Sequence, residues 1–294
     1  MPGVFTLIRA SFTLIPSRDL IAQPITSKVV KQVILRKARP GSILHKLLAD
    51  DSPISRAPEK PVKMSMISRA GRPLWNWVGG YPVVLRGGEE YGFDVVYVDS
   101  PIAEKRLGLG EGVAGRVIEE LTGLEGRSAV YGSGEATISL TSITAVSSDQ
   151  LGADLRGSGV RLEFQTPTLL QYPKPSRLRI RESVHSLYPT PHLLIMNLAQ
   201  KWEMYESGKR PVGIPAYIPF ELREVDHGIR PITIPLNGVG ERGFTGWAVY
   251  RLAAASQERL GSYLRLLHMA TFTGVGHSTS LGLGQVALSM LNHA

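Results

Sequence analysis

Near the end of the chain stands the stretch Ser256-Gln-Glu-Arg-Leu-Gly-Ser-Tyr-Leu-Arg-Leu-Leu-His-Met-Ala270, followed by Gly274-Val-Gly-His-Ser-Thr-Ser-Leu-Gly-Leu-Gly284. Leu260, Leu264 and Leu267 recur at the spacing of one helical face, which predicts a helix over the first part of the stretch. The apolar residues that follow the second part predict a strand. We therefore expect a helix, a glycine-rich loop and a closing strand.

Outward from this stretch, the sequence predicts one order of elements twice. In the first half we predict strands at Val4–Ile15, Pro61–Arg69, Tyr91–Val98 and Ser128–Val146, and helices at Ser27–Lys37 and Pro101–Leu121. In the second half we predict strands at Val160–Thr166, Ile229–Leu236, Gly243–Leu252 and Leu281–Leu288, and helices at Pro189–Tyr205 and Ser256–Ala270. Each half has the order β-α-β-β-α-β.

This order defines the ferredoxin-like split βαβ unit, an antiparallel sheet with both helices on one face. The fold class is therefore α+β, with two tandem ferredoxin-like domains. The polar, glycine-containing residues Ser147–Gly159 are the expected linker, which gives domains over residues 1–150 and 151–294. The open face of such a sheet is a candidate platform for RNA.

Positive charge is concentrated in the first half of the chain. The net charge is +8, and residues 27–72 alone contain eleven basic and three acidic residues, a surplus equal to that of the whole chain. Such clustering is expected of a surface that neutralises phosphates, whereas a basic face without a ligand is the plainer alternative. The distribution favours nucleic acid as the partner.

The composition excludes several other classes of protein. The chain has no cysteine, which rules out disulfides, thiolate nucleophiles and cysteine-bound zinc. It also lacks a His-Glu-x-x-His or Asp-x-Asp motif, so we expect no metal and no cofactor, and a metal-dependent nuclease is disfavoured. No apolar run approaches the roughly 20 residues that cross a bilayer, and the start lacks the pattern of a secretion signal. We therefore expect a cytoplasmic protein.

The glycine-rich loop matches neither of two well-known nucleotide-binding patterns. No lysine lies between Gly274 and Gly284, as a Walker loop would require, and the chain ends too soon for a Rossmann fingerprint. Its glycines permit close approach of another backbone, with free N–H groups able to meet phosphate oxygens. Considered alone, the loop is better explained by a tight structural turn, because folding needs glycines more often than ligands do.

Three segments of the chain resemble a known family. The run Phe272–Val286 is similar to the C-terminal glycine-rich motif of the CRISPR-associated endoribonucleases that cut repeat RNA within precursor transcripts. Arg161–Leu169 resembles the opening strand of that family's second domain, and Gly243–Trp247 resembles the start of a later strand. The likeness spans nearly the whole chain. It places the sequence in the repeat-associated RNA-binding superfamily and implies two ferredoxin-like domains.

The resemblance also implies an activity. Members of this family typically cut without a metal: a 2′-hydroxyl attacks the adjacent phosphate and leaves a 2′,3′-cyclic phosphate and a 5′-hydroxyl. The residues responsible are expected in the first domain. In many members they are a histidine after the first helix, a tyrosine on that helix and a lysine at the next strand. Here His45 matches the histidine and Lys63 the lysine, whereas Arg36 stands at the tyrosine position.

Another branch of the family relies on lysines of the first helix, and Lys28 and Lys31 match them. These two residues are three apart and therefore on one helical face. The expected catalytic residues are thus His45, Lys28, Lys31 and Lys63. Imidazole exchanges protons near neutral pH, and positioned cations stabilise the charge that develops on the phosphate. General phosphate contact is the alternative role of the lysines.

RNA-binding residues are expected in both halves of the chain, without a catalytic role: Arg36, Arg242, Gly274, Gly276, His277, Gly282 and Gly284. The expected partner is CRISPR repeat RNA or the guide RNA made from it. A non-cleaving subunit that holds guide RNA in a CRISPR effector complex is the alternative function, which the departure at Arg36 keeps open. Other subunits of such a complex and a second copy of this chain are further candidate partners.

Overall fold

The structure is a computed structural model that describes residues 4–50, 59–76, 81–100, 104–105, 108–109, 112–129, 134–173, 183–207, 216–236, 239–254 and 256–292. The chain divides into two compact units. The first comprises residues 1–148 together with 204–208 and 280–282, and the second comprises 149–203, 209–279 and 283–294. None of the helices in the described residues is long and apolar enough to cross a membrane.

Within the described residues, the first unit has one large sheet with helices packed on it. The strands of the large sheet are β1 (Thr6–Pro16), β3 (Val62–Met64), β4 (Ser68–Arg69), β5 (Arg72–Pro73), β7 (Tyr91–Asp99), β8 (Gly126–Ala129) and β9 (Glu135–Ser147). A separate two-stranded sheet pairs β2 (Leu20–Ala22) with β6 (Val83–Leu85). Its helices are α1 (Ser27–Lys37), α2 (Ile43–Leu48) and α4 (Val113–Thr122).

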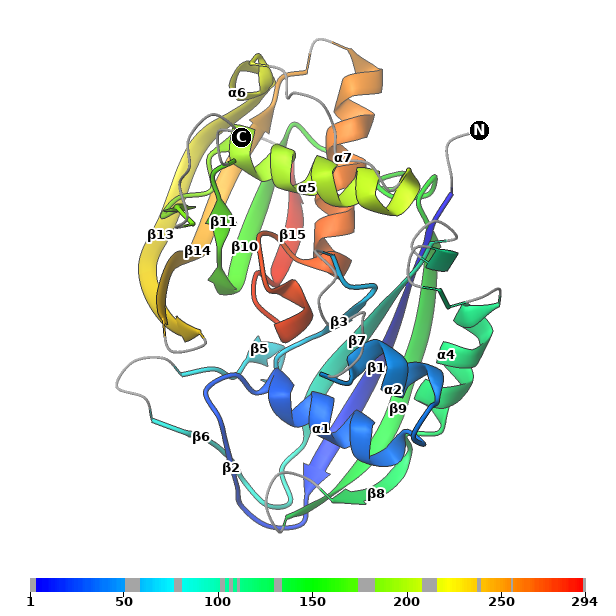
Figure 1. Ribbon diagram of the computed structural model, residues 1–294. Coiled ribbons are helices and arrows are strands. Elements are labelled where there is room, and N and C mark those ends of the chain that lie inside the picture. The colour runs from blue at the N-terminus through cyan, green and yellow to red at the C-terminus, as the bar shows by residue number, and fades with distance from the viewer. Residues whose placement is uncertain are drawn as a thin grey trace. The chain divides into compact units, whose positions relative to one another are not determined.

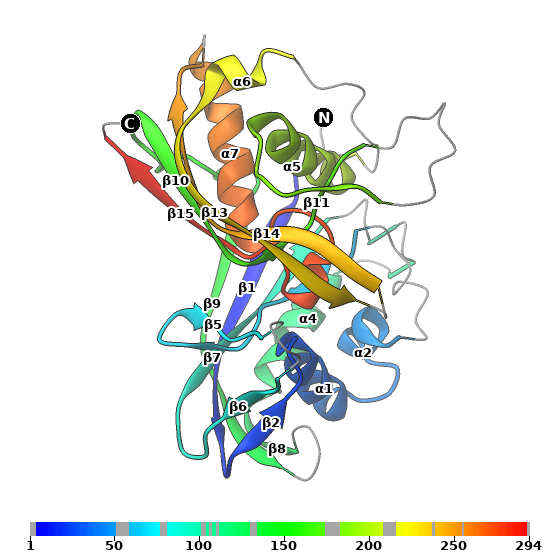
Figure 2. The same cartoon turned by 90° about the vertical axis from the view of Figure 1, so that its left-hand side faces the viewer.

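The sheet of the first unit has the order β5-β4-β7-β1-β9-β8, with β3 also paired to β7 and all pairs antiparallel. Strand β1 is central because it pairs with β7 on one side and β9 on the other, and its alternate residues Ala10, Phe12 and Leu14 are buried on one face. Phe12 lies opposite Phe93 of β7, and their rings stack at 5.0 Å. Helices α1, α2 and α4 cover one face of this sheet (Figures 1 and 2).

The second unit repeats the arrangement. Its main strands are β10 (Gly159–Thr168), β13 (Leu222–Leu236), β14 (Val239–Leu252) and β15 (Val286–Leu291), and a short pair joins β11 (Leu170–Gln171) to β12 (His185–Ser186). Its helices are α5 (Pro191–Glu206), α6 (Ile218–Glu221) and α7 (Gln257–Thr273), with the 3-10 turn η3 (Thr279–Leu281) after α7. The last residues of α5, from Met204, and residues Ser280 and Leu281 of η3 belong to the first unit.

The main sheet of the second unit has the order β13-β14-β10-β15, again antiparallel throughout. Figure 2 shows α5 and α7 on the same face of this sheet. Leu162 and Phe164 of β10 are buried on that face, and Phe164 meets Phe244 of β14 edge to face. The predicted α+β class with tandem ferredoxin-like folds is confirmed, since both sheets are antiparallel and carry their helices on one face.

Two of the predicted elements are wrong in extent because glycines interrupt them. The helix expected over 101–121 is interrupted: Glu104 and Lys105 are helical, and α4 begins at Val113, since Gly108 and Gly112 between them have φ of +64° and +69°, outside the range of a right-handed helix. Residues 101–103, 106–107 and 110–111 of that prediction lie outside the described residues. The strand expected over 281–288 begins at Val286, because Gly282 and Gly284 also have positive φ.

Two other predicted strands are divided. The segment 61–69 forms β3 and β4, separated at Ser65–Ile67, and the segment 128–146 lies in two paired strands, β8 and β9. The short elements β2, β6, α2 and α6 were not expected, because runs of three to six residues carry too little periodicity to be recognised.

Candidate functional site

The first helix presents two of the predicted lysines on its outer side. Val29, Val30, Val33 and Ile34 form the buried face of α1, while Lys28 is exposed and Lys31 partly exposed. The ammonium group of Lys31 forms an ion pair with Asp50, whose side chain is 90% exposed. Asp50 follows α2 in the chain, so this pair holds the end of α2 against α1.

His45 lies on α2, a short helix whose amino end is anchored by side chains. Ser42 caps the helix and accepts a hydrogen bond from the His45 backbone N–H. Both carboxylate oxygens of Glu120, on α4, accept backbone N–H groups of Ile43 and Leu44 at 2.8 Å. The His45 side chain is partly exposed. The backbone that carries His45 is thus held in place, while its side chain is open to a ligand on its exposed side.

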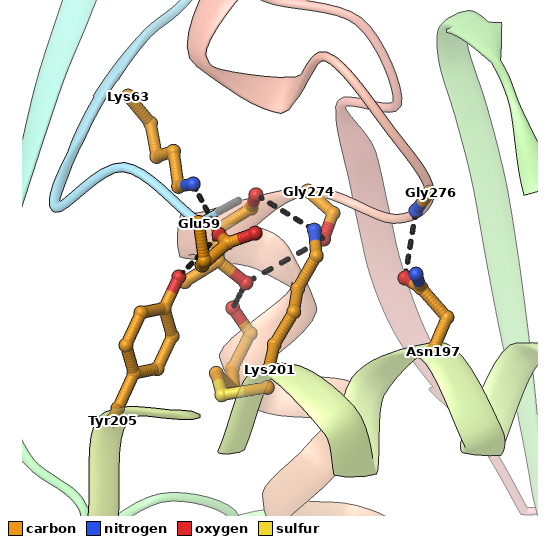
Figure 3. A network of polar contacts seen from close by, with 9 residues as sticks. Glu59, Lys63, Asn197, Lys201, Tyr205, Gly274 and Gly276 are labelled. Atoms are coloured by element: carbon orange, nitrogen blue, oxygen red, sulfur yellow. Dashed lines mark hydrogen bonds and ion pairs between the residues drawn. The ribbon is translucent and has the colours of Figure 1, made fainter. Parts of the chain in front are cut away.

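Lys63 on β3 is buried, with 4% of its surface exposed. Its ammonium group forms an ion pair with Glu59, and the Tyr205 hydroxyl donates to the same carboxylate oxygen at 2.6 Å (Figure 3). Burial and the adjacent Glu59 raise the pKa of the Tyr205 hydroxyl well above its ordinary value, so the hydroxyl remains a neutral donor. The charge of Lys63 is therefore already balanced within the first unit.

Lys60 is a further lysine of this region that the sequence had not suggested. Its side chain is partly buried and interacts electrostatically with Lys31, Lys63 and Asp50. Burial lowers the pKa of Lys60, the two lysines lower it further, and Asp50 opposes the shift. We refer to Lys28, Lys31, His45, Lys60 and Lys63 together as the basic site.

The four glycines of the glycine-rich loop are buried and all have positive φ, between +66° and +84°. A Cβ on Gly284 would lie 1.8 Å from the Val275 carbonyl oxygen, and one on Gly276 would lie 2.4 Å from that of Leu169. A Cβ on Gly282, which counts with the first unit, would lie 2.8 Å from the Met66 backbone nitrogen. The absent side chains therefore make room for the protein's own backbone.

Side chains of α5 fix the loop from within the second unit. The Lys201 ammonium donates to the carbonyls of Gly274 at 2.8 Å and Thr273 at 3.4 Å, and Asn197 Oδ1 accepts the Gly276 N–H at 2.8 Å (Figure 3). Lys201 is 4% exposed. These bonds satisfy carbonyl groups at the carboxyl end of α7 that the helix itself leaves without partners.

His277 is the exposed residue within this closed loop. Its ring lies edge-on to that of His185, with centroids 6.4 Å apart, and His185 Nδ1 is 3.1 Å from a carboxylate oxygen of Glu241. Burial lowers the pKa of His185, and Glu241 partly offsets this effect. Arg242, beside Glu241, is exposed, as is Arg36 on α1. Of the predicted RNA-binding residues, these three side chains are accessible, whereas the glycines are not.

Several residues that position the site escaped the sequence analysis. Glu120, Glu59 and Asn197 escaped because each has a partner far along the chain: Ile43 is 77 positions from Glu120, Tyr205 is 146 from Glu59, and Gly276 is 79 from Asn197. The sequence did contain a sign of the role of Lys201. This lysine shares a helical face with Leu194, Leu198 and Tyr205, all of which are buried. A lysine on a buried face of a helix needs buried partners. Among the described residues, no three His, Asp or Glu side chains gather as a metal site would require.

Comparisons with known proteins place this geometry in a family. Residues 8–146 match the model of the Cas6 N-terminal domain, and residues 162–286 match that of the CRISPR-associated endoribonuclease Cas6. The chain belongs to the Cas6 family. It is thus an endoribonuclease of the group that processes CRISPR repeat RNA, as the resemblance implied. The Cas6 match in the second unit includes the glycine-rich loop.

Similar proteins extend over the full length of the chain. CRISPR-associated endoribonuclease Cas6 1 of Saccharolobus solfataricus is 24% identical, over 99% of this chain and 98% of its own length. The structure of Thermus thermophilus Cas6 has a TM-score of 0.59 at 16% identity, over 98% of this chain and 99% of that one. A Cas6 product complex gives a TM-score of 0.60 at 19% identity, over 98% and 100%. These Cas6 structures share the fold.

Proposed function

We propose that this member of the Cas6 family cuts CRISPR repeat RNA in precursor transcripts without a metal ion. The 2′-oxygen beside the scissile bond attacks phosphorus, the bond to the 5′-oxygen breaks, and the products end in a 2′,3′-cyclic phosphate and a 5′-hydroxyl. The observation that carries this proposal is His45: a partly exposed imidazole on a helix that Glu120 and the Lys31–Asp50 pair hold against α1 and α4.

His45 transfers a proton in this reaction, either from the attacking 2′-hydroxyl or to the departing 5′-oxygen. Lys28, Lys31 and a lysine of the β3 region, for which the sequence suggests Lys63, supply positive charge near the phosphate, which becomes more negative as the fifth bond to phosphorus forms. Lys28 is the most accessible of the three, because Lys31 and Lys63 each share their charge with a carboxylate.

RNA binding extends beyond the reacting phosphate. In this proposal residues 1–150 form the domain that carries the chemistry and residues 151–294 the domain that carries the RNA-binding loop. His277, Arg242 and Arg36 contact the RNA directly because their side chains are exposed. Gly274, Gly276, Gly282 and Gly284 contribute by giving the loop the backbone conformation that presents His277.

The decisive experiment is a cleavage assay in EDTA. A labelled CRISPR repeat RNA should be cut once and leave a cyclic-phosphate end. The matched control is the same RNA with a 2′-deoxy nucleotide before the scissile bond, which should bind equally and resist cutting. Cleavage that requires Mg²⁺, or that also cuts the deoxy substrate, would refute the mechanism. Binding should weaken steeply with salt, since phosphate contacts release counterions.

The alternative function is a non-cleaving subunit that holds guide RNA in a CRISPR effector complex. Two ion pairs favour this alternative function. Lys31 is paired with Asp50 and Lys63 with Glu59, so the charges of two expected catalytic cations are already neutralised. Tight binding of repeat RNA without any product in the same assay would establish this alternative. Association with other subunits, or of two copies of this chain, is then measured by light scattering with and without RNA.

A further inference from the structure

We infer that Lys60, rather than Lys63, is the cation of the β3 region that contacts the scissile phosphate. This inference rests on the proposed function, because it assigns a catalytic residue to the same site. In this arrangement Lys63 is a positioning residue that holds Glu59 and Tyr205 together.

The balance of charges in the basic site supports this assignment. Its four lysines face two acidic residues that pair with them, Asp50 with Lys31 and Glu59 with Lys63. Among the described residues, the structure gives no hydrogen bond or ion pair to the ammonium groups of Lys28 and Lys60. Within the described part of the chain, the surplus of positive charge therefore lies at these two residues, and a phosphate that approaches the site meets two cations that no described carboxylate binds directly.

The surroundings of Lys63 make it a poor contact for RNA. Its side chain is buried, and its ion pair with Glu59 is held in turn by the buried Tyr205 hydroxyl. To reach a phosphate, Lys63 would leave the partly buried carboxylate of Glu59 without its cation, which is unfavourable. Lys60 can contact a phosphate without breaking an ion pair of this kind. It is partly exposed and lies within electrostatic range of both Lys31 and Lys63, so it occupies the same region of the first unit.

The environment of Lys60 also makes its charge sensitive to pH. Burial lowers its pKa from the ordinary lysine value, and repulsion by Lys31 and Lys63 lowers it further, while Asp50 raises it. Lys60 is charged below that pKa and loses its charge as the pH rises through it. The cleavage rate should therefore fall at an alkaline pH below that at which an ordinary lysine titrates, and an arginine at this position should remove the fall.

The test uses single-turnover cleavage of repeat RNA with the enzyme in excess, so that the rate and the dissociation constant are measured separately. Lys60→Ala should lower the cleavage rate by about 10²-fold. It should raise the dissociation constant by no more than about fivefold, as expected for one exposed charge contact. Lys105→Ala, which removes one exposed positive charge elsewhere in the first unit, is the control and should change neither quantity.

Two further variants separate catalysis from folding. Lys60→Arg should retain more of the rate than Lys60→Ala and should shift the alkaline fall to higher pH. Lys63→Met should lower the thermal midpoint of unfolding, which Lys60→Ala should leave unchanged. A normal rate for Lys60→Ala in an enzyme that cleaves would overturn the assignment and leave the proposed function intact. An absence of cleavage in the wild-type protein would instead refute the proposed function.

Discussion

The glycine-rich loop and the basic site differ in what their polar groups already contact. In the loop, the backbone bonds to Pro167, Leu169, Asn197 and Lys201, and each glycine makes room for another part of the backbone. In the basic site, Lys28, His45 and Lys60 are at least partly exposed. A conspicuous sequence motif thus serves mainly to hold a conformation, whereas less conspicuous side chains are left available for chemistry.

The largest effect is expected from His45→Ala, which removes the proton-transferring group. The cleavage rate should fall by about 10²–10⁴-fold, or roughly 3–5 kcal/mol in activation free energy. His192→Ala, on α5 of the second unit, is the matched control and should cleave normally. The measurement is the single-turnover rate. An undiminished rate for His45→Ala would move catalysis onto the lysines of α1 and β3.

Gly284→Ala should destabilise the protein strongly, because its φ is +66° and the new Cβ would lie 1.8 Å from the Val275 carbonyl oxygen. We expect a loss of about 2–4 kcal/mol in the free energy of unfolding, measured by denaturant titration. Gly261→Ala, inside α7 with open space around it, should instead stabilise by about 0.5–1 kcal/mol. Unchanged stability of Gly284→Ala with lost RNA binding would show that this glycine serves the ligand directly.

Lys201→Met tests the anchor of the loop. The substitution leaves the carbonyls of Thr273 and Gly274 without their buried donor, so the free energy of unfolding should fall by about 1–3 kcal/mol. Gln200→Met, at the neighbouring position of α5, should change it by less than about 0.5 kcal/mol. Equal thermal midpoints for the two variants would mean that the loop keeps its shape without Lys201.

His277→Ala should have the smallest effect and should act on binding alone. Its side chain is exposed, so the free energy of unfolding should remain unchanged while the dissociation constant for repeat RNA rises by about fivefold. Fluorescence anisotropy at a fixed salt concentration provides the measurement. A loss of stability in this variant would indicate that the imidazole supports the loop through its contact with His185.

Most of the fold could be predicted from local patterns. The helix Ser27–Lys37 was predicted to the residue, and the order of the major elements in both halves was correct. Positive φ at Gly108, Gly112, Gly282 and Gly284 displaced the predicted ends, because composition does not reveal which glycines leave the helical or extended range. The catalytic and RNA-binding residues that the sequence suggested remain predictions for the experiments above.

By itself the sequence determined the repeated β-α-β-β-α-β order, the concentration of positive charge in residues 27–72 and the likeness to the repeat-cleaving endoribonucleases. These depend on periodicity, composition and local motifs, which lie within short stretches. Only the tertiary structure decided which of the described lysines form ion pairs. Asp50 and Glu59 resemble other acidic residues in the chain until folding brings Asp50 to Lys31 across 19 positions and joins Glu59 with Lys63 and Tyr205.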